Sequence, residues 1–143
     1  MEYAKLNNGI EMPMAGIGTF LMTPDEAQAA VGSALSCGYR LIDTASAYMN
    51  EKAVGRAMKA SGLARGEIFL ATKLWPAFYE QADAVERTLP RLDPDYIDLL
   101  LLHPPPGHST AGHTLIETAY KAGKVPALCL SHLTPAHHPD HTC

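Results

Sequence analysis

The chain has 143 residues, a length that suits a single domain with a core of its own. Hydrophobic residues make up 47% and charged residues 18%, which is typical of a globular protein and excludes a disordered chain. The net charge of -4 comes without a basic run, and the apolar runs are too short to cross a bilayer, so neither nucleic acid nor a membrane is an expected partner.

The first predicted element is a β-hairpin over residues 3–14. It alternates loosely around Asn7-Asn8-Gly9, and Asn-Gly between apolar flanks favours a tight hairpin turn. The segment has no basic region followed by an apolar run, so we do not expect a signal peptide.

Short apolar runs then alternate with helical patterns. The runs repeat at roughly 25 to 30 residues, the size of a βα unit, and their continuous apolar character is typical of parallel strands covered on both faces. The predicted strands cover residues 15–20, 40–45, 68–74, 96–103 and 125–130, and the predicted helices cover residues 24–37, 50–61, 81–91 and 114–122. Thr23, Pro24 and Glu26 form a strong start signal for the first helix, whereas Pro90 weakens the third. The alternation predicts an α/β fold with a parallel sheet.

The composition changes after Val125. The final stretch, PALCLSHLTPAHHPDHTC, is rich in His and Pro and has Asp140 as its single charged residue. We therefore expect a main domain over residues 1–124, followed over residues 125–143 by a fifth strand and an irregular tail. An out-of-frame ending is one hypothesis for this shift. The three cysteines of the chain form no CxxC pair, which favours a reducing cytoplasm.

Four polar residues stand out against this pattern. Asp43, Lys73 and His103 end three successive predicted strands, and Tyr48 lies in the loop after Asp43. Functional groups gather at the carboxyl ends of parallel strands, so we expect all four at one mouth of the fold. Taken singly, each has a simpler interpretation: a turn-capping Asp, a solvated Lys, or a His that ends a strand before three prolines.

Together the four residues suit carbonyl reduction. A phenol titrates near pH 10 in water, and a neighbouring ammonium favours its ionised form. Asp43 would hold Lys73 charged, His103 would orient a carbonyl oxygen, and Tyr48 would protonate that oxygen. No side chain donates hydride, so a nicotinamide cofactor is implied.

Several longer strings carry a family resemblance: KLNNGIEMPMAGIGTF, GYRLIDTASAYMNEKAVGRAM, IFLATKLW, LDPDYIDLLLLHPP and YKAGKV. With them the chain resembles the N-terminal half of an aldo-keto reductase. The resemblance implies the first half of a (β/α)8 TIM barrel behind an N-terminal β-hairpin, and NADPH-dependent reduction of aldehydes or ketones. It places the catalytic tetrad on Asp43, Tyr48, Lys73 and His103, the cofactor contacts on Gly18, Thr19, Phe20, Asp43 and Ser131, and a wall of the substrate pocket on Trp75, with no metal.

The sequence also departs from the family. A complete barrel takes about 250 residues, and the absent half would carry the adenine and 2′-phosphate contacts. Ser131-His132 stands where the family reads Ser-Asn, and that Asn normally holds the carboxamide. A half barrel leaves two strand edges unpaired, so we expect a homodimer or higher self-association that completes the barrel.

Other functions stay open from the sequence. The chain fits a non-catalytic oligomeric half barrel, or a truncated fragment that keeps the tetrad by descent. His137, His138, His141 and Cys143 are close enough to bind a metal, although their spacing matches no standard zinc module. The prolines at residues 104–106 suit a stiff loop better than a polyproline ligand.

Overall fold

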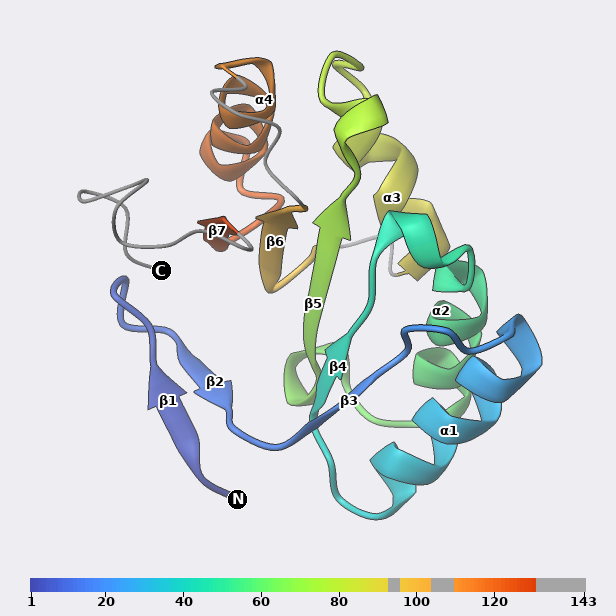
Figure 1. Ribbon diagram of the computed structural model, residues 1–143. Helices are drawn as coiled ribbons and strands as arrows, with labels where there is room; N and C mark the ends of the chain where they lie inside the picture. Colours follow the sequence, from blue (N-terminus) through green and yellow to red (C-terminus); the bar gives the residue numbers. More distant parts are fainter. Residues whose placement is uncertain (93–95, 104–109, 131–143) are drawn as a thin grey trace.

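The computed structural model describes residues 1–92, 96–103 and 110–130, and Figure 1 shows their arrangement. Their centre is a five-stranded parallel sheet whose strand order follows the chain order. The strands are β3 (Gly16–Gly18), β4 (Leu41–Asp43), β5 (Phe69–Leu74), β6 (Leu99–Leu102) and β7 (Ala127–Leu130). Each strand pairs with the next one along the chain, as in a barrel. The predicted α/β partial barrel is confirmed.

Among the described residues, four α-helices connect the strands and cover the outer face of the sheet (Figure 1). They are α1 (Pro24–Ser36), α2 (Glu51–Ala60), α3 (Ala84–Leu92) and α4 (Thr110–Lys121). Thr23 caps α1 as predicted. Its hydroxyl accepts from the Glu26 backbone amide, and the Glu26 carboxylate accepts from the Thr23 backbone amide. Pro90 lies inside α3, where it removes one helical hydrogen bond without ending the helix.

The strands are shorter than predicted, and two helices begin three or more residues away from the predicted start. α3 begins at Ala84 rather than at residue 81, and α4 begins at Thr110 rather than at residue 114. The first turn of α4 contains the glycine at residue 112 and polar neighbours, which have low helix propensity. The sequence alone therefore does not predict a helix there. Three short 3₁₀ helices also escaped prediction: η1 (Ser46–Tyr48), η2 (Arg65–Glu67) and η3 (Pro76–Phe78). η1 and η3 directly follow β4 and β5, so they shape the loops at the carboxyl edge.

The core lies mainly between the sheet and its helices. One cluster joins α3 and α4 to β5 and β6, and a second joins α1 and α2 to β4 and β5. Ile42, Leu70 and Leu100 are completely buried there, one on each of the three central strands. Burying such a side chain contributes roughly 1.5–3 kcal/mol, so this layer fixes the strands that carry the candidate site.

The predicted hairpin covers part of the inner face of the sheet. It consists of β1 (Tyr3–Lys5) and β2 (Glu11–Pro13), which pair antiparallel. Leu6, Ile10 and Met12 pack against the apolar residues on that face. The side-chain amide of Asn8 donates to the Pro126 carbonyl at 3.0 Å. Because Pro126 precedes β7, the hairpin loop lies near the amino end of that strand and leaves the carboxyl edge open. In the described part of the chain, no helix is long and apolar enough to cross a membrane.

Candidate active site

The four polar residues lie at the carboxyl edge of the sheet. Asp43 is the last residue of β4, Lys73 is the next to last of β5, and His103 follows β6. Tyr48 is the last residue of η1, the 3₁₀ turn after β4. β4 pairs with β5 and β5 with β6, so the three strand ends are neighbours.

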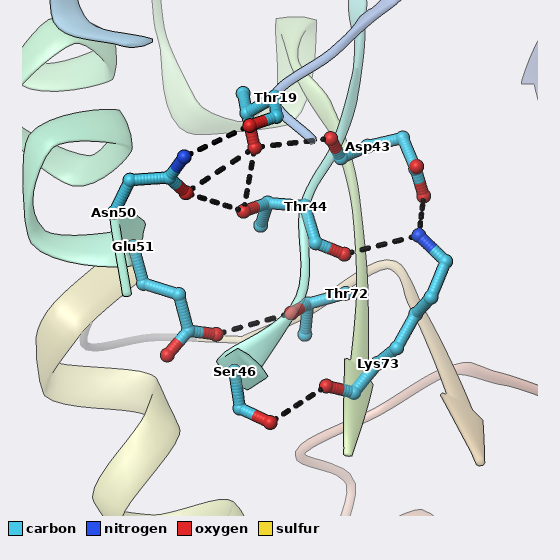
Figure 2. Close-up of polar contacts among 8 residues, drawn as sticks. All are labelled: Thr19, Asp43, Thr44, Ser46, Asn50, Glu51, Thr72 and Lys73. Carbon is cyan, nitrogen blue, oxygen red and sulfur yellow. Dashed lines mark hydrogen bonds and ion pairs between the residues drawn. The ribbon is translucent and has the colours of Figure 1, made fainter. Parts of the chain in front are cut away.

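A short ion pair joins two of these residues (Figure 2). Lys73 Nζ lies 2.5 Å from Asp43 Oδ1 and also donates to the Thr44 carbonyl oxygen at 3.1 Å. The Lys73 side chain is only 11% exposed, whereas that of Asp43 is 43% exposed. A buried ammonium needs such partners, because removing a charge from water is costly unless it is paired and hydrogen-bonded. The carboxylate therefore satisfies Lys73 while keeping much of its own surface open.

The aromatic ring of Tyr48 lies beside this pair. Lys73 Nζ is 5.5 Å from the centre of the ring, and the Phe20 ring packs on Tyr48 with centres 5.1 Å apart. The Tyr48 amide donates to the Ala45 carbonyl, and Met49 follows in the left-handed region with φ of 58°. A non-glycine residue rarely adopts this conformation, so the turn after Tyr48 carries local backbone strain.

His103 lies beside Trp75. The two ring centres are 5.9 Å apart, and the His103 amide donates to the Leu74 carbonyl at 3.0 Å. Trp75 keeps 41% of its surface exposed and so offers an apolar wall at this edge. Tyr79 supports the same region from inside the core. Burial raises the pKa of Tyr79 to about 12, and a hydrogen bond with the His103 backbone offsets part of that rise. Tyr79 therefore stays neutral and serves packing.

The predicted cofactor residues at the end of β3 differ in exposure. Gly18 ends β3 and is exposed, Thr19 is buried, and Phe20 is exposed at the site. The Thr19 amide donates to the Asp43 carbonyl at 3.0 Å, so this loop is tied to the end of β4. Ser131 lies outside the described residues.

Sequence reasoning missed a set of buried polar residues around the site (Figure 2). Asn50 contacts Thr19 and Thr44, while the Ser46 hydroxyl donates to the Lys73 carbonyl at 3.0 Å and accepts from the Trp75 amide at 3.2 Å. These residues carry no sequence signal beyond their place after a strand, where Ser, Thr and Asn are ordinary loop residues.

Glu51 forms a second buried contact set, behind the site. It is 4% exposed, accepts from the Thr72 hydroxyl at 3.1 Å and pairs with Arg91 at 3.0 Å. Burial raises the pKa of Glu51, and the charge of Arg91 offsets part of that rise. These contacts join α2, β5 and α3 directly behind Lys73.

We found no metal-binding cluster in residues 1–92, 96–103 and 110–130. The histidines and cysteine of the tail, His132 and the three prolines after His103 lie outside the described residues.

Comparison with known proteins identifies the family. The family model described as "Aldo/keto reductase family" matches residues 14–139. The chain belongs to the aldo/keto reductase family. It is 41% identical over 142 residues to a glyoxal reductase from Bacillus subtilis, with 95% of this chain and 51% of the relative covered. It is 44% identical over 102 residues to a methylglyoxal reductase from Salmonella typhimurium, with 71% and 37% covered.

Solved structures agree with this aldo/keto reductase assignment. The crystal structure of MGS-M4, an aldo-keto reductase from a deep-sea metagenome of the Medee basin, superposes with a TM-score of 0.86 at 43% identity. The superposition covers 95% of this chain and 51% of that protein. The chain thus spans about half the length of these relatives or less.

Proposed function

We propose that this chain reduces a small aldehyde or ketone to an alcohol with NADPH, and that Tyr48 donates the proton. The observation that supports the proposal best is the position of Lys73. Its ammonium bridges Asp43 and the Thr44 carbonyl and lies 5.5 Å from the centre of the Tyr48 ring. This arrangement places a fixed positive charge beside a phenol at an open edge of the sheet.

The positive charge of Lys73 supports Tyr48 as the proton donor. Loss of the phenolic proton leaves a negative charge on Tyr48, and a fixed ammonium nearby stabilises that charge. Asp43 holds the ammonium in place through the ion pair. Tyr48 then protonates the carbonyl oxygen of the substrate, and His103 donates a hydrogen bond that orients the same oxygen.

The cofactor residues fit the exposed part of the site. The NADPH nicotinamide would supply the hydride. We propose that Gly18, Thr19, Phe20, Asp43 and Ser131 contact the cofactor. The open surface of the Asp43 carboxylate suits a ribose hydroxyl as donor, and the exposed Phe20 ring suits contact with a flat apolar surface.

The substrate class follows from the relatives and from the apolar wall. The relatives act on glyoxal and methylglyoxal by name, and both are small dicarbonyl compounds. The exposed indole of Trp75 beside His103 would pack on a short aliphatic chain while His103 holds the oxygen. We propose methylglyoxal as the first substrate to test and the cytoplasm as the compartment.

The test measures NADPH oxidation by absorbance with methylglyoxal as substrate. We expect turnover that Tyr48→Phe abolishes, because the ring stays and only the proton donor is lost. Tyr39→Phe is the matched control, since Tyr39 is exposed on the connection from α1 to β4 and should be neutral. Absence of saturable NADPH binding by calorimetry would refute the proposal and leave the non-catalytic half barrel as the better interpretation.

A further inference from the structure

Asn50 lies buried between the loops that follow β3 and β4. It is 1% exposed, yet both ends of its amide are hydrogen-bonded. Nδ2 donates to the carbonyl oxygens of Thr19 at 2.9 Å and Met22 at 3.0 Å, while Oδ1 accepts from the Thr44 hydroxyl at 3.3 Å. The Thr19 hydroxyl lies 3.3 Å from Oδ1 and 2.9 Å from the Thr44 hydroxyl, so its single proton is shared between these two acceptors. We call Asn50, Thr19, Met22 and Thr44 the Asn50 clamp.

The Asn50 side chain bonds the clamp residues instead of capping α2. Asn50 is the N-cap residue of α2, where an Asn side chain usually accepts from the first free helical amides. Here the side chain makes no capping bond. A cap contributes about 1 kcal/mol, so the bonds of the clamp offset that loss and orient Asn50 towards the site instead.

Three contacts lead from the clamp to the proposed proton-donor group. The Thr44 carbonyl oxygen accepts from Lys73 Nζ at 3.1 Å. The Thr19 amide donates to the Asp43 carbonyl at 3.0 Å. Phe20, the neighbour of Thr19, packs on the Tyr48 ring. Figure 2 shows the first of these contacts, and it also shows the Thr19 hydroxyl beside the Asp43 carbonyl oxygen, at 3.5 Å.

We propose that Asn50 is a positioning residue for carbonyl reduction: by holding Thr44, it fixes the ammonium of Lys73 beside the ring of Tyr48. This role rests on the proposed function, but the geometry that it predicts is measurable without turnover. Asn50 itself touches no reacting atom. It acts through Thr44: Asn50 accepts from the Thr44 hydroxyl, the Ala71 carbonyl accepts from the Thr44 amide, and the Thr44 carbonyl oxygen bonds the Lys73 ammonium.

The chain offers a matched pair of variants for the test. Thr44→Val removes one hydroxyl of the clamp and keeps the shape of the side chain. Thr72→Val makes the same change at an equally buried threonine, next to Lys73 in sequence, whose hydroxyl bonds Glu51 instead. Thr44→Val removes two buried contacts, with Thr19 and Asn50, and Thr72→Val removes one, with Glu51. Both changes weaken the buried polar network, but only Thr44→Val loosens a residue whose carbonyl oxygen bonds Lys73. Asn50→Ala is the stronger variant, to be used if it folds.

The readout is the rate at which trinitrobenzenesulfonate modifies Lys73 in the folded full-length chain, measured by peptide mass spectrometry. We expect Thr44→Val to raise this rate about threefold to tenfold, the factor that corresponds to the loss of one hydrogen bond. Thr72→Val should stay near wild type. Equal rates in wild type, Thr44→Val and Thr72→Val would overturn the proposal, and so would an equal rise in both variants.

Kinetics separate this proposal from the proposed function. If the wild type oxidises NADPH with methylglyoxal, Thr44→Val should lower kcat while the KM for NADPH stays near wild type, and Thr72→Val should change neither. A change confined to KM would overturn the positioning role. If the wild type has no turnover, the proposed function fails, whereas the modification rate of Lys73 still tests the clamp.

Discussion

The ion pair between Lys73 and Asp43 gives a quantitative prediction, because its two partners differ in burial. In Asp43→Asn the Lys73 ammonium, 11% exposed, loses its charged partner and keeps neutral oxygens as acceptors, among them the Thr44 carbonyl. A hydrogen bond to a charged group contributes about 1.5–3 kcal/mol, and the 43% exposure of Asp43 argues for the lower end, since solvent screens the pair. We expect Asp43→Asn to lower the free energy of unfolding by about 1.5–2 kcal/mol.

Substitution of the other partner, Lys73, should lower the free energy of unfolding by less. In Lys73→Met the carboxylate of Asp43 remains, and water can hydrate its exposed surface. We expect a loss of about 1 kcal/mol or less for Lys73→Met, and a double variant less damaged than the sum of the two single variants.

Urea denaturation at pH 7 measures these differences, provided that the slope with denaturant stays constant across the variants. The control is the pair of Lys124 and Glu86, whose atoms lie 2.6 Å apart but whose side chains are 35% and 47% exposed. Glu86→Gln should cost about 0.2–1 kcal/mol, as exposed pairs do. If Asp43→Asn costs no more than Glu86→Gln, burial of the Lys73 ammonium does not decide the strength of the pair, and the reasoning is wrong.

Two further predictions concern Glu51 and the sheet edges. Burial raises the pKa of Glu51, so the protonated form is favoured in the folded state: its contribution to stability is full below the unfolded pKa and is lost as the pH rises through the folded pKa. The stability of wild type relative to Glu51→Gln should therefore fall as the pH rises from about 4 towards neutrality, and urea titrations that show it rising would contradict the assigned cause. Self-association stays a prediction from the sequence: β3 and β7 are the outer strands of the described sheet, and light scattering should give a dimer or larger species. A stable monomer at high concentration would refute it.

The positions of Asp43, Lys73 and His103 were predictable because the geometry of parallel strands is regular. Continuous apolar runs predict strands, and strand ends of a parallel sheet meet at one edge, so three residues separated by up to sixty positions could be placed together from their order alone. The start of α1 was predictable for a similar reason, since a capping box is a local signal.

The Asn50 clamp could not be predicted from the sequence. An Asn before a helical pattern indicates an N-cap, and the threonines at residues 19 and 44 are ordinary residues after strands. Thr19 lies 25 residues from Thr44 and 31 from Asn50 along the chain, and all three residues become buried only in the folded protein. Local signals do not report which side chains meet at such a distance, so the supports of the site emerge only from the tertiary structure.

Proton donation and hydride delivery, the two parts of the proposed reaction, depend on different parts of the fold. Asp43 and Lys73 lie on β4 and β5, and each of these strands has a hydrogen-bonded neighbour on both sides. The Asn50 clamp ties together the loops that follow β3 and β4. The proposed proton-donor group is therefore preorganised by described residues at the carboxyl edge of the sheet. The proposed cofactor contacts are spread more widely along the chain, from Gly18 to Ser131, and Ser131 lies outside the described residues. If turnover is slow, we expect the cause on the hydride side: a high KM for NADPH together with Lys73 that stays protected from modification.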